Sequence, residues 1–584
     1  MKTSRFIALV ATVLAFAAPG ALAKPSAEDQ KFEKFVDSTL AEFWKLNPEY
    51  AFAVGYYKHA DQLIVPDAAA RKASLEFDAA VLAKLDGFDA AKLSASNRVD
   101  QTLIRNQLAA DRWYTEVFRS WQWQPSQYNV ADGFARQLNT EYAPLDTRLK
   151  HMLARLEKVP AYYAAAKANI ERPTLEHTVI AIEQNKGALG VFDDEMLKKV
   201  DASKLSKSDK ALFRTRVDAA KAAISDYVAF LTAMRPSLEA GGARSFRIGK
   251  DLYAAKFGHD IQSSFSAEQL YAKAKAEKAS LHDRMELLAR VLWPKYMAGK
   301  PMPLDRLELI GAVIGELSKH HTTPDKFVET IRKQIPELEK FVADHDLITQ
   351  DPTRPLVVRE TPVYQRGFAG AGVDAPGPYD PTANTYYNVS PLDGYSPADA
   401  ESYLREYNDW MLQLLNIHEA VPGHYLQLVH ANKSKSLVKS LFGNGAMVEG
   451  WAVFSERVML EAGYGGNTPE MWLIWMKWNL RAVCNTIIDY EIQTGDLGKD
   501  DMVRLLVREA FQSDKEATNK WRRATLSQVQ LTSYYDGYAE ITALRDEHKA
   551  RLGKDFSVKG FNDRFLSYGN APVKLIRELM QSAP

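Results

Sequence analysis

The residues best suited to chemistry lie between His418 and His424. The segment reads His-Glu-Ala-Val-Pro-Gly-His, and Glu419 directly follows the first histidine. Two imidazoles can hold one zinc ion, and a carboxylate beside them can take a proton from a water molecule. Zinc hydrolases commonly use His-Glu-x-x-His, in which the two histidines share one face of a helix. Here the histidines are six residues apart, which on a regular helix places them on different faces.

Pro422 and Gly423 change that geometry. Proline cannot donate the helical hydrogen bond and clashes with the preceding turn, whereas glycine tolerates unusual backbone angles. If two residues loop out just before His424, the two histidines return to one helical face. We therefore expect a distorted helix that brings both imidazoles to one metal ion. The alternative is a helix that ends at Pro422 and leaves two unrelated histidines.

A third metal ligand is expected from Glu449, which opens an apolar helical segment running through Val453 and Phe454. A carboxylate on a buried helix needs a partner for its charge. A zinc ion held by His418, His424 and Glu449, one ion per chain, would be such a partner. This set leaves the fourth position open for water, as hydrolytic zinc sites do.

Glu456 follows Glu449 by seven residues and therefore lies on the same helical face. We expect its carboxylate to accept a hydrogen bond from a ligand imidazole. The alternative is a solvated acid that pairs with Arg457 or Lys477. His430 is a weaker ligand candidate because no carboxylate stands beside it.

Helical periodicity surrounds these residues and predicts a mainly α fold. The clearest helical segments are Phe32–Trp44, Asp146–Lys167, Lys207–Met234, Ala267–Leu292 and Pro324–His345. Residues 351–393 are instead rich in Pro, Gly, Asp and Tyr, with extended runs at 356–359 and 385–389. We expect a small β element there that lines a cleft; the alternative is a surface connector. The expected regions are a helical one over residues 24–350 and a catalytic one with the zinc site over residues 351–584.

Composition and the first residues point to an exported protein. Among 584 residues, Lys and Arg total 74, as do Asp and Glu, so no net charge favours nucleic acid or an anionic membrane. Residues 1–23 carry two basic residues, an apolar run and Ala21-Leu22-Ala23, which predicts a signal peptide cleaved after Ala23. The apolar run is too short to span a bilayer, so no membrane insertion is expected after cleavage. The residue directly after Ala23 is Lys24 and not a cysteine, which excludes lipidation at that site.

The motifs resemble those of a known family. His-Glu-Ala-x-Pro-Gly-His followed by Glu-Gly-Trp-Ala at residues 449–452 is similar to the bacterial domain-of-unknown-function family 885, which is related to the gluzincin zinc metallopeptidases. Further likeness lies at residues 47–55, 374–378, 386–389, 523–530 and 533–537. Two histidines frequent in the family are missing, after Arg481 and at Asn562. The metal-binding residues are intact.

The resemblance implies a two-lobed helical metallopeptidase-like fold and hydrolysis of peptide bonds. The expected signal peptide would place this activity in the periplasm or outside the cell. Glu419 would act as general base on a water molecule and later protonate the leaving amine. Tyr534 and Arg523, which fall on the family pattern, would donate hydrogen bonds to the developing oxyanion.

Substrate binding is expected beside the catalytic residues. The segment Tyr386–Val389 could be an edge strand that pairs with a peptide substrate, so that Tyr387 or Asn388 touches it. A core strand is the alternative. Two other functions stay open, namely a zinc amidase acting on another amide such as a cell-wall peptide, and a catalytically inactive binding protein. The oligomeric state, the native metal, and endo- versus exopeptidase action are not indicated by the sequence.

Overall fold

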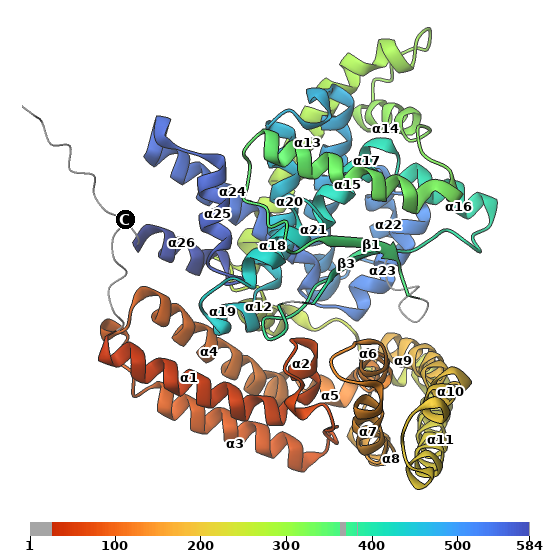
Figure 1. Ribbon diagram of the computed structural model, residues 1–584. Coiled ribbons are helices and arrows are strands. Elements are labelled where there is room, and N and C mark those ends of the chain that lie inside the picture. The colour runs from red at the N-terminus through yellow and green to blue at the C-terminus, as the bar shows by residue number, and fades with distance from the viewer. Residues whose placement is uncertain (1–25, 363–369, 382, 583–584) are drawn as a thin grey trace, which may run out of the picture.

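The computed structural model describes residues 26–362, 370–381 and 383–582, and the expected signal peptide lies outside these ranges. The fold is mainly helical with one small sheet, as the sequence predicts (Figure 1). Within the described ranges, no helix combines the length and the apolar character needed to cross a membrane.

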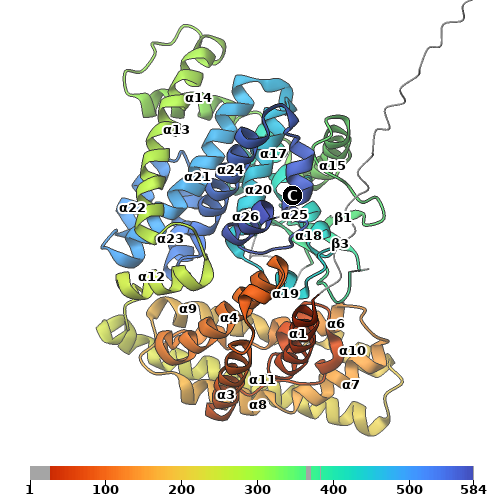
Figure 2. The same ribbon diagram turned by 90° about the vertical axis from the view of Figure 1, so that its left-hand side faces the viewer.

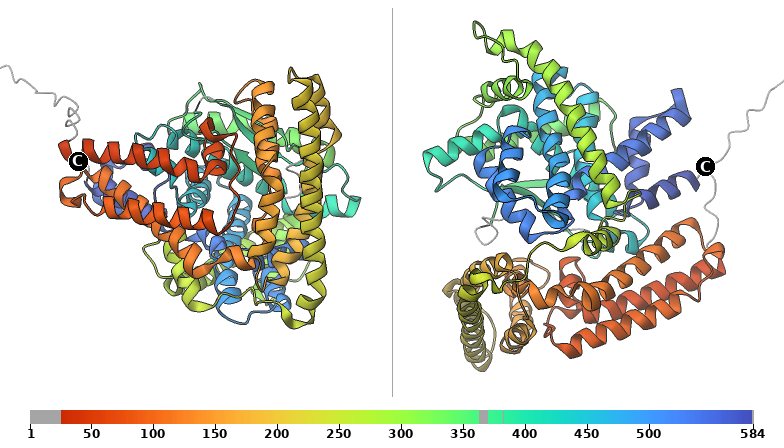
Figure 3. Two further views of the ribbon diagram at one scale, coloured as in Figure 1. Left: turned by 90° about the horizontal axis from the view of Figure 1, so that it is seen from below. Right: turned by 180° about the vertical axis from the view of Figure 1, so that it is seen from behind.

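The first eleven helices lie together below the rest of the molecule in Figure 1, and Figure 2 and the right-hand view of Figure 3 show the same division. They are α1 (Ala27–Leu46), α2 (Pro48–Ala53), α3 (Ala68–Leu85), α4 (Ala95–Trp113), α5 (Ser120–Trp123), α6 (Ala131–Asn139), α7 (Leu145–Leu156), α8 (Val159–Asn169), α9 (Leu175–Ala188), α10 (Asp194–Ala202) and α11 (Lys207–Ser237). Helices α6 to α11 enclose a hydrophobic core of their own.

The remaining helices form the upper part of Figure 1. Those before the sheet are α12 (Gly249–Asp260), α13 (Ala267–Tyr296), α14 (Arg306–Leu317) and α15 (Phe327–Asp344). Those after it are α16 (Pro397–Glu406), α17 (Asp409–Glu419), α18 (His424–Ala431), α19 (Leu437–Leu441), α20 (Gly445–Glu461), α21 (Pro469–Thr494), α22 (Lys499–Arg508), α23 (Asp514–Leu526), α24 (Ser533–Leu552), α25 (Val558–Leu566) and α26 (Val573–Ser582). Helices α13 and α14 pack against α21, so they share the core of the C-terminal helices. The expectation that a catalytic region begins at residue 351 stays a prediction.

The expected helical segments are present with small changes at their ends. Helix α1 begins with a capping box between Ser26 and Asp29, and α13 begins with the same motif between Ser266 and Gln269. The segment expected over 146–167 is two helices, α7 and α8. Pro160 lies in the first turn of α8, where its missing N–H group costs least.

A buried ion pair joins the lower and upper parts of the molecule. Lys439 of α19 donates from Nζ to Asp100 Oδ1 of α4 at 2.6 Å, and both side chains are buried. Because each charge is removed from water, each depends on the other for compensation. This pair adds a polar contact to the hydrophobic core that α1 and α4 share with the C-terminal helices.

The sheet has three strands, β1 (Leu356–Glu360), β2 (Ala371–Asp374) and β3 (Thr385–Val389). Their order is β1-β3-β2, with β3 parallel to β1 and antiparallel to β2. The expectation that Tyr386–Val389 forms an edge strand is wrong, because β2 covers the side that a substrate would need. Tyr387 is fully buried, and its hydroxyl donates to Asn416 Oδ1 at 2.9 Å. The core-strand alternative therefore holds, and β3 supports α17.

Candidate metal centre

Helix α17 ends at Glu419 and α18 begins at His424, so the expected distorted helix is two helices joined by residues 420–423. The N–H of Gly423 donates to the carbonyl of Ile417 at 3.0 Å, and that of Leu426 donates towards Ala420 at 3.4 Å. Both bonds span six residues in place of the usual four. These longer bonds bridge the extra residues, and the ring centroids of His418 and His424 lie 4.8 Å apart.

Gly423 and Pro422 shape this loop. A Cβ atom on Gly423 would clash with the carbonyl oxygens of His418 and Ile417, so only glycine fits. The Val421–Pro422 peptide bond is cis. The indole N–H of Trp451 donates to the Pro422 carbonyl at 2.9 Å, which ties the loop to α20.

The side chains of His418, His424 and Glu449 converge at one point. Glu449 Oε2 lies 3.4 Å from His424 Nε2 and 3.7 Å from His418 Nε2. Their potential ligand atoms all lie within 4.8 Å of one another. Neighbouring ligand atoms in a tetrahedral zinc site, with bonds of about 2.0–2.1 Å, are roughly 3.3 Å apart. The three residues thus fit a zinc ion with little rearrangement.

Glu456 lies behind this cluster and is completely buried. Its Oε1 is 2.8 Å from His418 Nδ1 and accepts a hydrogen bond from Trp478 Nε1 at 2.9 Å. This contact leaves Nε2 of His418 directed at the cluster. Glu456 is therefore not a solvated acid; Arg457 pairs with Glu461, and Lys477 with Glu406.

The electrostatics of the cluster favour a positive charge at its centre. Burial works against a charged His418, yet the carboxylates of Glu449 and Glu456 outweigh it and raise the pKa of His418 to about 10. Burial likewise disfavours a charged Glu449, but hydrogen bonds with His418 and His424 keep the pKa of Glu449 well below its usual range. A cation held among these side chains would balance the charge of the carboxylates, which the proton on His418 balances here.

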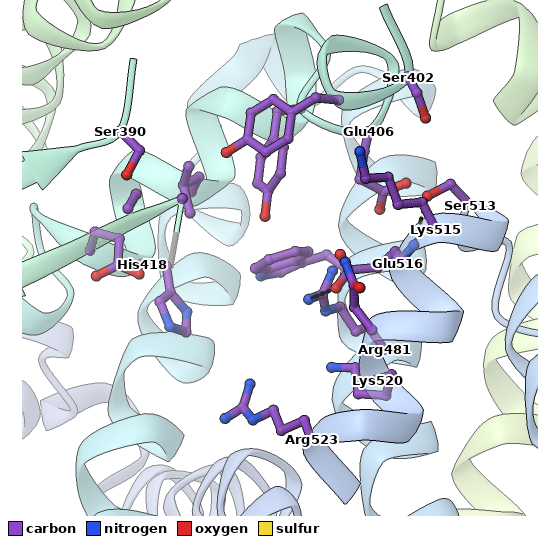
Figure 4. A pocket seen from close by; sticks show the side chains of 18 of the residues that line it. Ser390, Ser402, Glu406, His418, Arg481, Ser513, Lys515, Glu516, Lys520 and Arg523 are labelled. Carbon is purple, nitrogen blue, oxygen red and sulfur yellow. Dashed lines mark hydrogen bonds and ion pairs between the residues drawn. The ribbon is translucent and has the colours of Figure 1, made fainter. Parts of the chain in front are cut away.

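A cavity of about 480 Å³ opens beside the cluster. Its wall includes His418 and Glu419 from α17, Arg523 from α23 and Tyr534 from α24, and Figure 4 shows part of this arrangement. Within the described part of the chain, the Glu419 carboxylate makes no hydrogen bond or ion pair, so it is free to bind a water molecule or a substrate proton. The volume is in the usual range for small-ligand sites.

Tyr534 and Arg523 contact each other in this wall. Arg523 Nη2 donates to the Tyr534 hydroxyl at 3.1 Å. Tyr534 is carried to the cluster by a close approach of α24 to α20, where Gly450 faces Gly537 and a Cβ atom on either would clash with the other helix. Burial and then Glu449 raise the pKa of Tyr534, so its hydroxyl keeps its proton and can donate it in a hydrogen bond.

Two of the expected substrate contacts do not reach the cavity. Tyr387 and Asn388 are absent from its lining, and Asn388 Oδ1 accepts a hydrogen bond from Arg359 Nε at 2.7 Å. The end of the sheet instead reaches the cavity wall through Ala371 and Ser390. His430 points elsewhere, since its Nε2 lies 2.8 Å from the carbonyl oxygen of Thr349.

The sequence did not predict that Trp478, Arg481, Glu516 and Lys520 line the cavity. Trp478 belongs to a helical series of tryptophans that is typical of a hydrophobic core. Glu516, Lys520 and Arg523 are spaced by four and three residues, which puts them on one face of α23. This shared helical face was the signal that could have indicated a site. In a strongly charged segment, however, the same spacing also fits a helix that is exposed to solvent.

The fold and the site define a helical protein with a two-histidine, one-glutamate cluster at the wall of a cavity. The chain belongs to the family described as "Bacterial protein of unknown function (DUF885)", whose model matches residues 48–580. The chain is similar to a solved structure titled "a putative lipoprotein of unknown function" from Shewanella oneidensis, with 52% identity and a TM-score of 0.86, covering 94% of this chain and all of that one.

A "putative lipoprotein" from Colwellia psychrerythraea has 16% identity and a TM-score of 0.76, with coverage of 95% of this chain and 98% of that one. At that identity the likeness concerns the fold alone. No curated protein matches the chain. The term lipoprotein applies to those two proteins. The single cysteine of this chain, Cys484, is buried in α21.

Proposed function

We propose that this protein is a zinc-dependent peptidase of the gluzincin type. His418, His424 and Glu449 would hold one zinc ion per chain, and Glu419 would serve as the general base. The observation that carries the proposal is the convergence of the three ligands at a cavity wall that also presents the Glu419 carboxylate, which has no partner among the described residues. A site without catalytic purpose has no need of that base.

Bound zinc supplies a Lewis acid that polarises a carbonyl group and makes a water molecule more acidic. Glu419, next to the ligand His418, accepts the proton of the attacking water and passes it to the leaving amine. Tyr534 and Arg523 donate hydrogen bonds to the oxygen of the scissile carbonyl as it gains charge. Glu456 keeps His418 in the orientation and tautomer that metal binding requires.

The cavity supports short peptides or unfolded segments as substrates. A space of about 480 Å³ holds a few residues and excludes a folded domain. Signal-like residues 1–23 support a periplasmic or secreted location. Sequencing the amino terminus of the exported protein tests this location, because cleavage predicts a start at Lys24.

Metal content and turnover together test the function. The mature protein should contain about one zinc ion per chain by elemental analysis and should hydrolyse members of a short-peptide library. His424→Ala should lose both the metal and the activity. His430→Ala, a histidine on the same helix that faces Thr349, is the matched control and should retain both.

Glu419→Gln separates the base from the metal site. It should keep the zinc ion and lose nearly all hydrolysis. Turnover at the wild-type rate in this variant would refute the assignment of the base. Zinc without turnover of any peptide by the wild type would instead favour a different amide substrate, such as a cell-wall peptide, or a binding protein.

A further inference from the structure

One lysine in the cavity wall is almost completely buried. Lys520 of α23 is only 3% exposed. In the described part of the chain, its Nζ makes no hydrogen bond and no ion pair. The side chain lines the same cavity as His418 and Glu419, and Figure 4 shows its amine directed towards the open space. A buried ammonium group without a partner is costly, so its presence calls for an explanation.

The acidic groups near Lys520 are already engaged with other cations. Glu516 pairs with Arg481, and Glu406 pairs with Lys477 at 2.9 Å. The neighbouring Arg523 contacts only neutral oxygens in the described chain, those of Gln530 and Tyr534. This side of the cavity thus presents two basic side chains that have no acidic partner among the described residues.

We propose that Lys520, together with Arg523, forms a subsite that binds a carboxylate group of the peptide substrate. The inference rests on the proposed function and adds a substrate class to it, namely peptides that carry a carboxylate within reach of the scissile bond. That carboxylate is either the free carboxyl terminus or an acidic side chain. Bound there, it fixes the peptide while the amide bond lies at Glu419.

The protonation of Lys520 agrees with this role. Burial, reinforced by Arg481, holds the pKa of Lys520 well below its usual range. A carboxylate at its amine favours the ammonium form and makes a charge-assisted hydrogen bond, which is stronger than one between neutral groups. The subsite therefore selects anionic ligands over neutral ligands of the same shape.

Paired peptides and a charge-removing variant test the subsite in the mature, zinc-loaded protein. One pair is a short peptide as the free acid and as the carboxyl-terminal amide; the other pair differs by Glu or Gln in a side chain. Lys520→Met should raise KM for the carboxylate-bearing member of one pair by about 10–100-fold, the cost of one charged hydrogen bond. Its effect on kcat and on the neutral member should be small.

Two further variants act as controls. Lys520→Arg should restore much of the preference because it keeps the charge. Lys515→Met removes another cavity lysine, which is exposed and pairs with Asp399 at 2.5 Å, and it should leave the preference unchanged. Thermal unfolding of Lys520→Met should show a folded protein, since methionine removes an unpaired buried charge without emptying the space.

Measurements of peptide binding distinguish a failure of this subsite from a failure of the proposed function. Calorimetry with Glu419→Gln should show tighter binding of the free acid or the Glu peptide than of its neutral partner, and Lys520→Met in that background should abolish the difference. Hydrolysis of both members with equal KM, and no change in Lys520→Met, would overturn the subsite and leave the peptidase function intact. Charge-selective binding without hydrolysis of any peptide would support the subsite and overturn the function.

Discussion

His418 and Glu456 form a buried hydrogen bond of 2.8 Å between an imidazole Nδ1 atom and a carboxylate that is wholly shielded from water. The other nitrogen of the ring, Nε2, is thereby turned to the point where His424 and Glu449 meet. Glu456 is held in turn by Trp478. The orientation of one candidate ligand therefore depends on a residue that would never touch the metal.

Replacing Glu456 with Gln should weaken zinc binding by about 10–100-fold, the usual effect of losing a partner behind a ligand histidine. The glutamine amide keeps the side-chain volume but loses the negative charge that orients the His418 ring and raises its basicity. The zinc Kd can be measured by competition with a chromogenic chelator. Glu461→Gln, on the same helix and paired with Arg457, is the control and should bind zinc as the wild type does. Equal zinc affinity in both variants would show that Glu456 is merely structural.

Gly423 offers a test of the loop between the two histidines. Gly423→Ala should lower the free energy of unfolding by about 1–3 kcal/mol, because the added methyl group meets the carbonyl oxygens of His418 and Ile417. The displaced loop should also lower the zinc content. Both quantities follow from thermal unfolding and elemental analysis.

Gly445→Ala is the matched control, since a Cβ atom there would meet no other atom within 4 Å. It should retain the stability and the zinc content of the wild type. A fully stable, zinc-loaded Gly423→Ala protein would mean that the loop has a different conformation in solution.

The sequence predicts those parts of the site whose geometry depends only on residue type and on spacing within a short segment. His418, Glu419 and His424 stand within one short segment, and the seven-residue spacing of Glu449 and Glu456 places both on one helical face. The loop at Pro422 and Gly423 follows from the chemistry of these two residues. Such features need only local geometry.

Other parts depend on contacts between distant segments. Strand β2 is four residues long and contains Gly372, so it shows no strand pattern, and nothing in the sequence indicates that it covers one side of β3. Lys520 lies in the segment Asp-Lys-Glu-Ala-Thr-Asn-Lys-Trp-Arg-Arg, whose composition is typical of a solvated helix. Its burial comes from the packing of α23 on other helices and has no local signal.

Asp78 in α3 predicts a pH dependence of stability away from the candidate site. Burial, reinforced by Asp111, raises the pKa of Asp78 from 3.8 to about 7. The folded state therefore binds the proton more tightly than the unfolded state does. The contribution of Asp78 is most favourable below about pH 4 and is lost as the pH rises to about 7.

Asp78→Asn should accordingly unfold at a higher temperature than the wild type at pH 8, with a smaller difference at pH 5. Glu76→Gln, an exposed carboxylate on the same helix, should change little at either pH. Thermal unfolding followed by circular dichroism provides the measurement. An Asp78→Asn difference that is the same at both pH values would mean that Asp78 titrates normally in the folded protein.

Tyr534 tests the assignment of the oxyanion donors. Its hydroxyl accepts a hydrogen bond from Arg523 at 3.1 Å and keeps its own proton to donate into the cavity. Tyr534→Phe should lower kcat for peptide hydrolysis by about 10²–10³-fold, the effect of removing one donor to a developing oxyanion, with zinc content and KM little changed. Steady-state kinetics on one good library peptide measures this.

The next residue supplies the control for that loss. Tyr535 directs its hydroxyl to the carbonyl of Lys273 at 3.3 Å, away from the cavity wall, so Tyr535→Phe should keep the wild-type kcat. A loss of kcat in Tyr534→Phe alone assigns the effect to the hydroxyl at the cavity and not to disturbance of α24. If kcat survives in Tyr534→Phe, Arg523 is left as the donor, and Arg523→Lys should then show the loss, because its shorter ammonium cannot reproduce the planar guanidinium contact.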